Sequence, residues 1–166
     1  MKSDEIAMEV IDVLTDLSVP YMVVGSLSSN YYGIARSTND ADIVVEFKDI
    51  SPRQIAARLG AEFRLQPQAT FETITSTTRY VIDVIDVPFK IELFSLSDDP
   101  HDQERFRRRV RHQIHHREVY LPTPEDVIIT KIYWAQSRGE RGKDAEDVRS
   151  IMAMRAESLD LTYTHT

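Results

Sequence analysis

The sequence predicts a mixed α/β (α+β) fold, in which helices flank a mixed sheet and further helices close the C-terminus. Apolar residues recur at helical spacing near both ends of the chain, whereas the middle holds short β-branched and aromatic runs. The predicted order is helix, strand, helix, strand, helix, a β-rich middle and two closing helices, which is not a regular βαβ alternation. The 166 residues suit a single domain over 1–166, with a core over about 1–122 and closing helices over about 123–156.

The N-terminal segment predicts a helix, a strand and a second, polar helix. Acidic residues follow Ser3 as in the first turn of a helix, and apolar residues then recur at helical spacing as far as Leu17. Pro20 ends that helix. The short apolar run over 21–24 is typical of a buried strand, and it leads into a Gly-Ser turn and a polar helical turn that ends near Gly33.

Prolines, glycines and apolar runs delimit the remaining elements. Pro52 and Pro124 each stand at a helix start, and Gly60 ends the first of these helices. The strands over 79–85 and 89–94 are joined by a turn and form a hairpin. We therefore expect strands over 42–47, 71–76, 79–85, 89–94 and 119–121, a turn at 86–88, and helices around Phe106, from Pro124 to a break at 139–142, and over 143–154.

Composition and charge exclude several classes of protein. A hydrophobic fraction of 42% is enough for a buried core, and a net charge of −7 argues against a simple nucleic-acid coat protein. The chain has no cysteine, so disulfides, thiolate zinc sites and cysteine nucleophiles are excluded. We find no signal peptide and no apolar run of the ~20 residues that cross a bilayer, so we expect a cytoplasmic protein without membrane contact.

Asp40 and Asp42 form the clearest candidate site. They stand two residues apart at the start of a predicted strand, so both carboxylates point to one side of the sheet while Ala41 faces the core. Two carboxylates held together favour a cation between them, and Mg²⁺ accepts carboxylate oxygens together with substrate phosphates. The alternative is a chance D-x-D pair in a chain with 27 acidic residues.

A third acidic ligand should come from a neighbouring strand, because two carboxylates seldom suffice for a metal. Glu92 is the first candidate, since Ile91 and Leu93 fall on one face of their strand and Glu92 on the other. Asp83 and Asp86 are the alternative candidates for the third ligand. Asp83 is the stronger of the two, because Asp86 lies in the predicted turn.

Gly25 and Ser26 indicate a phosphate-binding turn upstream of the acidic pair. They directly follow a buried strand and open a helix. Glycine lets the backbone approach a phosphate closely, the free N–H groups of a helix start attract anions, and the Ser26 hydroxyl can add a hydrogen bond. The alternative is a tight turn with an N-cap.

Two basic features have both functional and structural interpretations. Arg36 could brace a phosphate as a fork-shaped donor, or it could pair with Asp40 in a salt bridge. The stretch from Arg105 to Arg117 holds six arginines and no acid. It could bind RNA such as a tRNA acceptor stem, or it could be a solvated helix face whose arginines pair with acids elsewhere.

The run VVGSLSSNYYGIARSTNDADIVVEF resembles the DNA polymerase β-like nucleotidyltransferase superfamily, whose pattern is a Gly-Ser turn, a short helix and a D-x-D strand followed by a third acid. The runs RSTNDADIVV, KIELF, TPEDVIITKIYWAQ and RGKDAEDV more narrowly resemble small bacterial enzymes related to the AbiEii toxins. The resemblance spans residues 23–148.

The resemblance implies a metal-dependent enzyme that moves a nucleoside monophosphate from an NTP, such as ATP, to a hydroxyl acceptor on RNA, a protein or a small molecule. It assigns two Mg²⁺ ions to Asp40, Asp42 and Glu92, although the family usually has aspartate at the third position. Glu92 would hold the catalytic metal or accept the proton.

The resemblance assigns further positions and partners as well. Gly25 and Ser26 would bind phosphate. Lys131 matches a lysine that contacts the nucleotide in relatives; the alternative is that Lys131 is a surface lysine. It also implies a toxin role with an antitoxin partner. The unusual glutamate leaves a second hypothesis open, a catalytically silent NTP-binding or partner-binding module.

Overall fold

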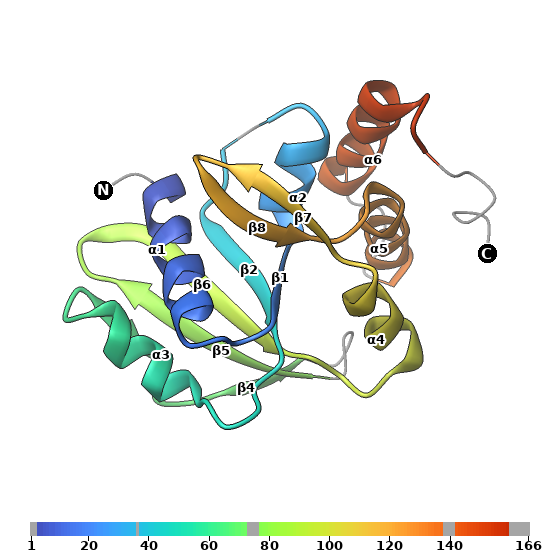
Figure 1. Cartoon of the computed structure of the whole chain (residues 1–166). Coiled ribbons are helices and arrows are strands. Elements are labelled where there is room, and N and C mark those ends of the chain that lie inside the picture. Colours follow the sequence, from blue (N-terminus) through green and yellow to red (C-terminus); the bar gives the residue numbers. More distant parts are fainter. Residues whose placement is uncertain (1–2, 36, 73–76, 138–141, 160–166) are drawn as a thin grey trace.

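The computed structural model describes residues 3–35, 37–72, 77–137 and 142–159 of the chain (Figure 1). The helices of this part are α1 (Ser3–Asp16), α2 (Gly25–Tyr32), α3 (Pro52–Leu59), α4 (Pro100–Arg107), α5 (Pro124–Ser137) and α6 (Gly142–Arg155). Its strands are β1 (Tyr21–Val24), β2 (Asp40–Val45), β3 (Phe63–Leu65), β4 (Thr70–Glu72), β5 (Thr77–Val84), β6 (Val87–Ser95), β7 (Val110–Ile114) and β8 (Arg117–Leu121). The predicted mixed α+β fold is confirmed.

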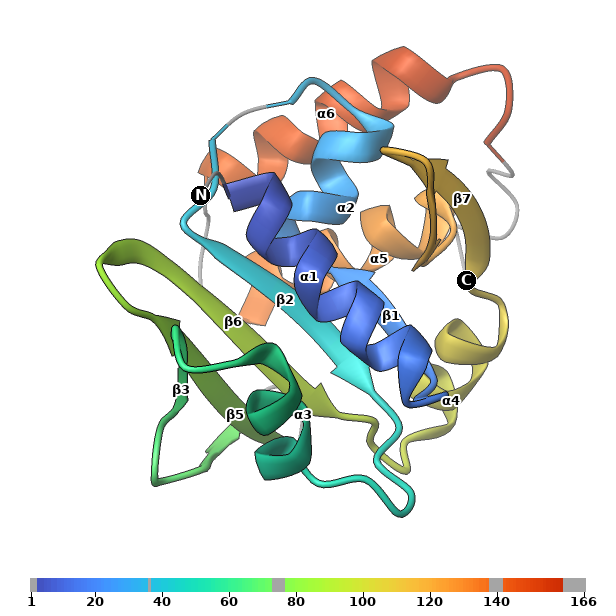
Figure 2. The same cartoon turned by 60° about the vertical axis from the view of Figure 1, so that its left-hand side comes forward.

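The main sheet is mixed, with the strand order β1-β2-β6-β5-β3 and with β4 also paired to β5. Strand β2 runs antiparallel to β1 and parallel to β6, and β6 runs antiparallel to β5. A parallel pair requires a long crossover, which here runs from β2 through α3 and the β3–β5 segment to β6. Helices α1 and α3 cover one face of the sheet, while α2, α5 and α6 lie on its other side (Figures 1 and 2).

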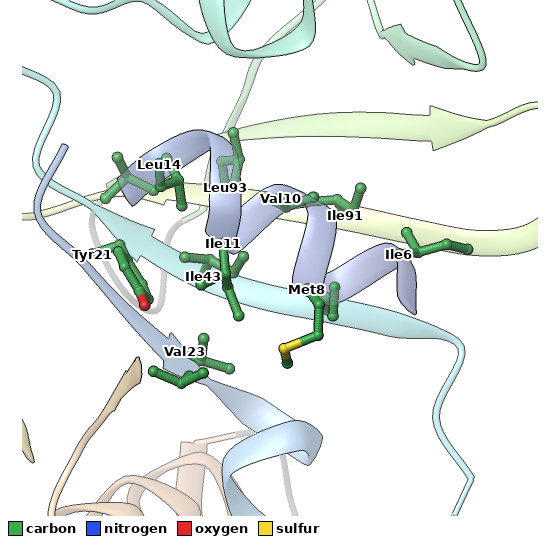
Figure 3. Packing of buried hydrophobic residues seen from close by; sticks show 14 of the residues in the cluster. Ile6, Met8, Val10, Ile11, Leu14, Tyr21, Val23, Ile43, Ile91 and Leu93 are labelled. Atoms are coloured by element: carbon green, nitrogen blue, oxygen red, sulfur yellow. The ribbon is translucent and has the colours of Figure 1, made fainter. Parts of the chain in front are cut away.

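The covered face of the sheet is built from alternate residues of its central strands. Figure 3 shows the apolar side of α1 lying across these strands, with Ile43, Ile91 and Leu93 among the contacts. All three of these side chains are 0% exposed. Since each buried aliphatic side chain of this size contributes ~1.5–3 kcal/mol, this layer holds β2 and β6 firmly in register.

The opposite face of the same strands is apolar only towards one end. A smaller cluster there joins Met22 and Val44 of the sheet to Phe106 of α4. Asp40 and Asp42 occupy the other end of this face of β2, because side chains two residues apart on a strand share a face. Asp40 and Asp42 therefore do not take part in core packing.

The predicted helix starts at Pro52 and Pro124 are confirmed, as is the stop at Gly60. Residues 139–141 of the predicted break at 139–142 lie outside the described residues, and α6 begins at Gly142. The β5–β6 hairpin is confirmed, but its turn is Ile85 and Asp86 rather than 86–88, because Val87 already pairs with Val84.

The basic stretch differs most from expectation. Only its first part is helical, since α4 ends at Arg107 and the chain then forms the β7–β8 hairpin. His115 and His116 make the turn of this hairpin with φ of 49° and 64°. Such turns normally use Asn-Gly, so the sequence carried no turn signal and β7 was missed. The short strand β3 was missed as well.

Within the described ranges, no helix combines the length and the apolar character that crossing a bilayer requires.

Candidate active site

Strand register brings three carboxylates together. Asp42 pairs directly with Glu92 across the parallel β2–β6 ladder, and Asp40 precedes Asp42 on the same face. Asp40, Asp42 and Glu92 each offer an oxygen atom, and these atoms all lie within 4.8 Å of one another. The predicted orientation of Ala41 into the core is confirmed, because its side chain is 0% exposed. The arrangement has the hard oxygen donors and the spacing that suit a divalent cation.

Gly25 fits against the carboxylate of Asp42. Val24, the last residue of β1, pairs with Asp42, so the chain turns into α2 directly beside that side chain. Gly25 has φ of +66°, and a Cβ atom built there would lie 2.3 Å from Asp42 Oδ2. Glycine is thus required both for the left-handed backbone and for space next to the acidic cluster.

The start of α2 leaves backbone donors for an anion. Val24 is the residue at its N-cap, and no side chain caps the helix there. The hydroxyls of Ser28 and Ser29 donate back to the Gly25 carbonyl at 2.8 and 3.2 Å. Because the N-cap residue Val24 supplies no side-chain acceptor, the first N–H groups of the helix, next to Ser26, can donate to an oxyanion.

The carboxyl group of Asp42 has the strongest electrostatic perturbation in the cluster. Burial raises its pKa well above the usual range, and a hydrogen bond with Glu92 and the charge of Asp40 raise it further. A hydrogen bond between two carboxyl groups needs a shared proton, and a cation held between them would remove that need. Asp42 Oδ1 is buried and finds no hydrogen-bond partner in the described part of the chain. These observations fit a bound cation.

Asp83, the rival third ligand, lies apart from the cluster. It is on the same face of the sheet as Glu92. On β5, Asp83 lies two residues beyond Val81, the partner of Glu92, and it pairs with Lys90. Its Oδ2 accepts a hydrogen bond of 3.0 Å from Gln66 Nε2. Asp86 is at the β5–β6 turn, as predicted. Among the described residues, Glu92 is therefore the acid that the fold brings to Asp40 and Asp42.

Two contacts of the acidic cluster were not predicted from the sequence. The Thr38 hydroxyl lies 3.1 Å from the backbone oxygen of Asp40 and 3.3 Å from its Oδ1, which orients the loop that enters β2. Arg79 of β5 forms an ion pair with Glu92, with 3.0 Å between Nη1 and Oε1. A threonine two residues before the D-x-D pair is a usable sequence signal, whereas nothing in the sequence connects Arg79 with Glu92.

Lys131 lies on the same side of the sheet, on α5. Its positive charge partly offsets the raised pKa of Asp42. Its Nζ atom is 2.9 Å from Oδ2 of Asp147 on α6, and the two side chains are only 12% and 6% exposed. Lys131 is therefore not a simple surface lysine. Arg36, the other predicted phosphate ligand, lies outside the described residues.

The arginines of the basic stretch are largely engaged with neighbouring groups. Arg108 pairs with the fully buried Asp126, at 3.0 Å, and with Glu104. Arg109 lies over the rings of Phe106 and Tyr120. The other ion pairs of this stretch are Arg105–Asp102, Arg107–Glu104, Arg111–Glu118 and Arg117–Asp12. Pairing with acids, the structural interpretation of these arginines, therefore holds for most of them.

Comparison with known proteins identifies the fold. No family model and no curated protein matches the sequence. Among solved structures, the antibiotic-resistance factor ANT(2'')-Ia matches with a TM-score of 0.65 and 11% identity, over 99% of this chain and 89% of that one. This is the polymerase β-like nucleotidyltransferase fold.

Two further nucleotidyltransferase structures show the same likeness. An antigenic nucleotidyltransferase-like protein from Paracoccidioides brasiliensis matches with a TM-score of 0.62 and 19% identity, over 99% of this chain and 87% of that one. The lincosamide antibiotic adenylyltransferase LnuA, bound to lincomycin, matches with 0.62 and 9%, over 92% and 98%. At such identities the likeness shows the fold alone, so the chemistry must be argued from the residues of this chain.

Proposed function

We propose that this protein is a metal-dependent nucleotidyltransferase that moves a nucleoside monophosphate from an NTP to a hydroxyl acceptor. The observation that carries the proposal is the cluster of Asp40, Asp42 and Glu92 beside the glycine that opens α2. Oδ1 of Asp42, which has no hydrogen-bond partner among the described residues, supports a cation in the cluster. The fold, which antibiotic adenylyltransferases share, supports this class of reaction.

Different residues would hold the metal ions and bind the phosphate groups. Mg²⁺ held by Asp40, Asp42 and Glu92, two ions in the full proposal, would neutralise phosphate charge and lower the pKa of an attacking hydroxyl. The N–H groups at Gly25 and Ser26 would bind phosphate oxygens, with Lys131 as a nearby cation.

The reaction itself is a substitution at phosphorus. An acceptor oxygen forms a bond to the α-phosphorus while the bond from that phosphorus to pyrophosphate breaks. The proton of the acceptor hydroxyl passes to Glu92 or to water.

The acceptor and the biological role remain predictions. ANT(2'')-Ia is known in complex with adenylyl-2''-tobramycin, and LnuA with lincomycin, so small-molecule hydroxyls are acceptors to test first. The RNA acceptor predicted from residues 105–117 gains no support from its arginines, because most of them pair with acids. The AbiEii-like toxin role, with an antitoxin partner, rests on the sequence resemblance.

Calorimetric titration with Mg²⁺ and each NTP tests the first step of the proposal. We expect wild type to bind NTP in a Mg²⁺-dependent manner and the double variant Asp40→Ala/Asp42→Ala to lose this binding. Asp83→Ala is the matched control, since it removes an acid from the same face of the sheet outside the cluster. Undiminished NTP binding by the double variant would overturn the proposal.

Incubation with labelled NTPs tests the transfer step. Total RNA, cell protein and a panel of hydroxyl-bearing small molecules serve as separate acceptors, and label on any one of them identifies the acceptor class. Mg²⁺-dependent NTP binding without transfer to any acceptor would instead support the silent binding module.

A further inference from the structure

Arg79 stands next to the acidic cluster on the strand adjacent to Glu92. It pairs with Phe94 across the antiparallel β5–β6 ladder, two residues from the Val81–Glu92 pair, so Arg79 and Glu92 share the site face of the sheet. Nη1 of Arg79 lies 3.0 Å from Oε1 of Glu92, and Nη2 lies 3.5 Å from Oγ1 of Thr70. The guanidinium thus meets Glu92 from β5, while Lys131 acts on Asp42 from α5.

The surroundings of Arg79 differ from those of an ordinary surface ion pair. Its side chain is 32% exposed and that of Glu92 is 17% exposed, so water screens the pair only in part. The Nε atom of Arg79 is buried and makes no hydrogen bond within the described ranges. An unsatisfied buried donor destabilises the fold, which argues that the pair is not kept for stability alone.

Glu92 has a specific need for such a partner. A glutamate carries one more methylene and one more rotatable bond than an aspartate such as Asp42, so its carboxylate reaches the cluster with less defined orientation. A guanidinium that binds one carboxylate oxygen fixes the plane of the group and leaves the second oxygen for a cation. Groups that hold a metal ligand in this way commonly change metal affinity or activity 10–100-fold when removed.

We propose that Arg79 is a positioning residue for Glu92: its guanidinium holds the carboxylate in the orientation in which it completes the cation site with Asp40 and Asp42. The inference rests on the proposed function. It assigns Arg79 no contact with the nucleotide, so removal of Arg79 should weaken divalent-cation binding and lower kcat while leaving the KM for NTP nearly unchanged.

Calorimetric Mn²⁺ titration and steady-state kinetics on Arg79→Met test the inference. We expect about a tenfold or greater loss in Mn²⁺ affinity and in kcat. Arg64→Met on the neighbouring strand β3 is the matched control. Arg64 is exposed, and in the β3–β5 ladder it lies opposite Asp83, which is outside the cluster. Arg79→Lys keeps the charge without the fork and should recover part of the loss. Thermal unfolding shows whether each variant folds.

The variant Glu92→Asp separates action through Glu92 from a general structural effect. The shorter side chain cannot meet Arg79 in the same way, so Arg79→Met should have little further effect in the Glu92→Asp background. An equal loss in both backgrounds, or a loss no larger than that of Arg64→Met, would overturn the inference. If wild type itself binds no Mn²⁺ and transfers no nucleotide, the proposed function fails instead.

Discussion

The two faces of β2 carry out different tasks with alternate residues of one strand. Ala41, Ile43 and Val45 are 0% exposed and pack under α1, whereas Asp40 and Asp42 lie on the opposite face. The apolar face holds the strand in place, and that rigidity lets the other face keep like charges close together. Stability and chemistry can therefore be changed separately at neighbouring positions of this strand.

The largest effect should come from the acidic face. We expect Asp42→Asn to lower nucleotide transfer at least about a thousandfold, because it removes a cation ligand. Without Mg²⁺ the same variant should unfold at a higher temperature than wild type, since it removes a buried carboxyl group that the fold holds in a raised-pKa state. Activity assays and calorimetry measure both quantities. Lower stability of the metal-free variant would contradict this account of the two faces.

The apolar face should give the reverse pattern. We expect Ile43→Ala to lower the free energy of unfolding by ~2–5 kcal/mol, because it leaves a cavity under α1. At temperatures where the variant stays folded, its Mg²⁺ affinity should remain within about threefold of wild type. Chemical denaturation and Mg²⁺ titration make the comparison. A loss of Mg²⁺ affinity as large as that of Asp42→Asn would mean that the faces are not independent.

Gly25→Ala should affect both properties, since Gly25 touches the acidic face through its backbone. The added Cβ would collide with Asp42 Oδ2, and alanine at φ of +66° is strained. We expect a loss of ~1–3 kcal/mol in stability together with weaker Mg²⁺ and NTP binding. Gly60→Ala is a useful control, because Gly60 also has positive φ but nothing lies within 4 Å of its added Cβ. Equal Mg²⁺ and NTP binding by the two variants would show that Gly25 plays no part in the site.

The smallest effect should appear away from both faces, at His112 of β7. The Tyr32 hydroxyl donates to the Pro122 carbonyl at 2.6 Å, so it accepts a hydrogen bond from Nε2 of a neutral His112 at 3.0 Å. Burial and the charge of Arg155 lower the pKa of His112. The neutral form is thus favoured in the folded state, and its contribution is lost as the pH falls through the lowered pKa.

We therefore expect the unfolding free energy to decrease by less than ~1 kcal/mol through His112 between pH 7 and pH 5. His112→Gln should show a smaller decrease than wild type in denaturation curves taken across that range. The exposed His101, changed to glutamine, provides the control. Identical pH slopes for wild type and His112→Gln would remove this prediction.

The sequence predicted the structure correctly where a local pattern has one structural consequence. Alternation placed Asp40, Asp42 and Glu92 on one face, and prolines marked two helix starts. It failed where structure depends on distant partners. The β7 strand lies in an arginine-rich run whose neutralising acids, such as Asp12 and Asp126, come from other elements. The Arg79–Glu92 pair likewise depends on the β5–β6 register, which no local pattern specifies.

The parallel pairing of β2 with β6 sets the order in which a newly synthesised chain can become competent. Asp40 and Asp42 leave the ribosome before α3 and three further strands, and Glu92 follows only after them. Lys131 and its partner Asp147 are made later still. At ~5–20 residues per second, the nascent chain spends several seconds with one of the three carboxylates of its acidic cluster missing. Any activity that needs all of these groups thus begins only after Asp147 has been made.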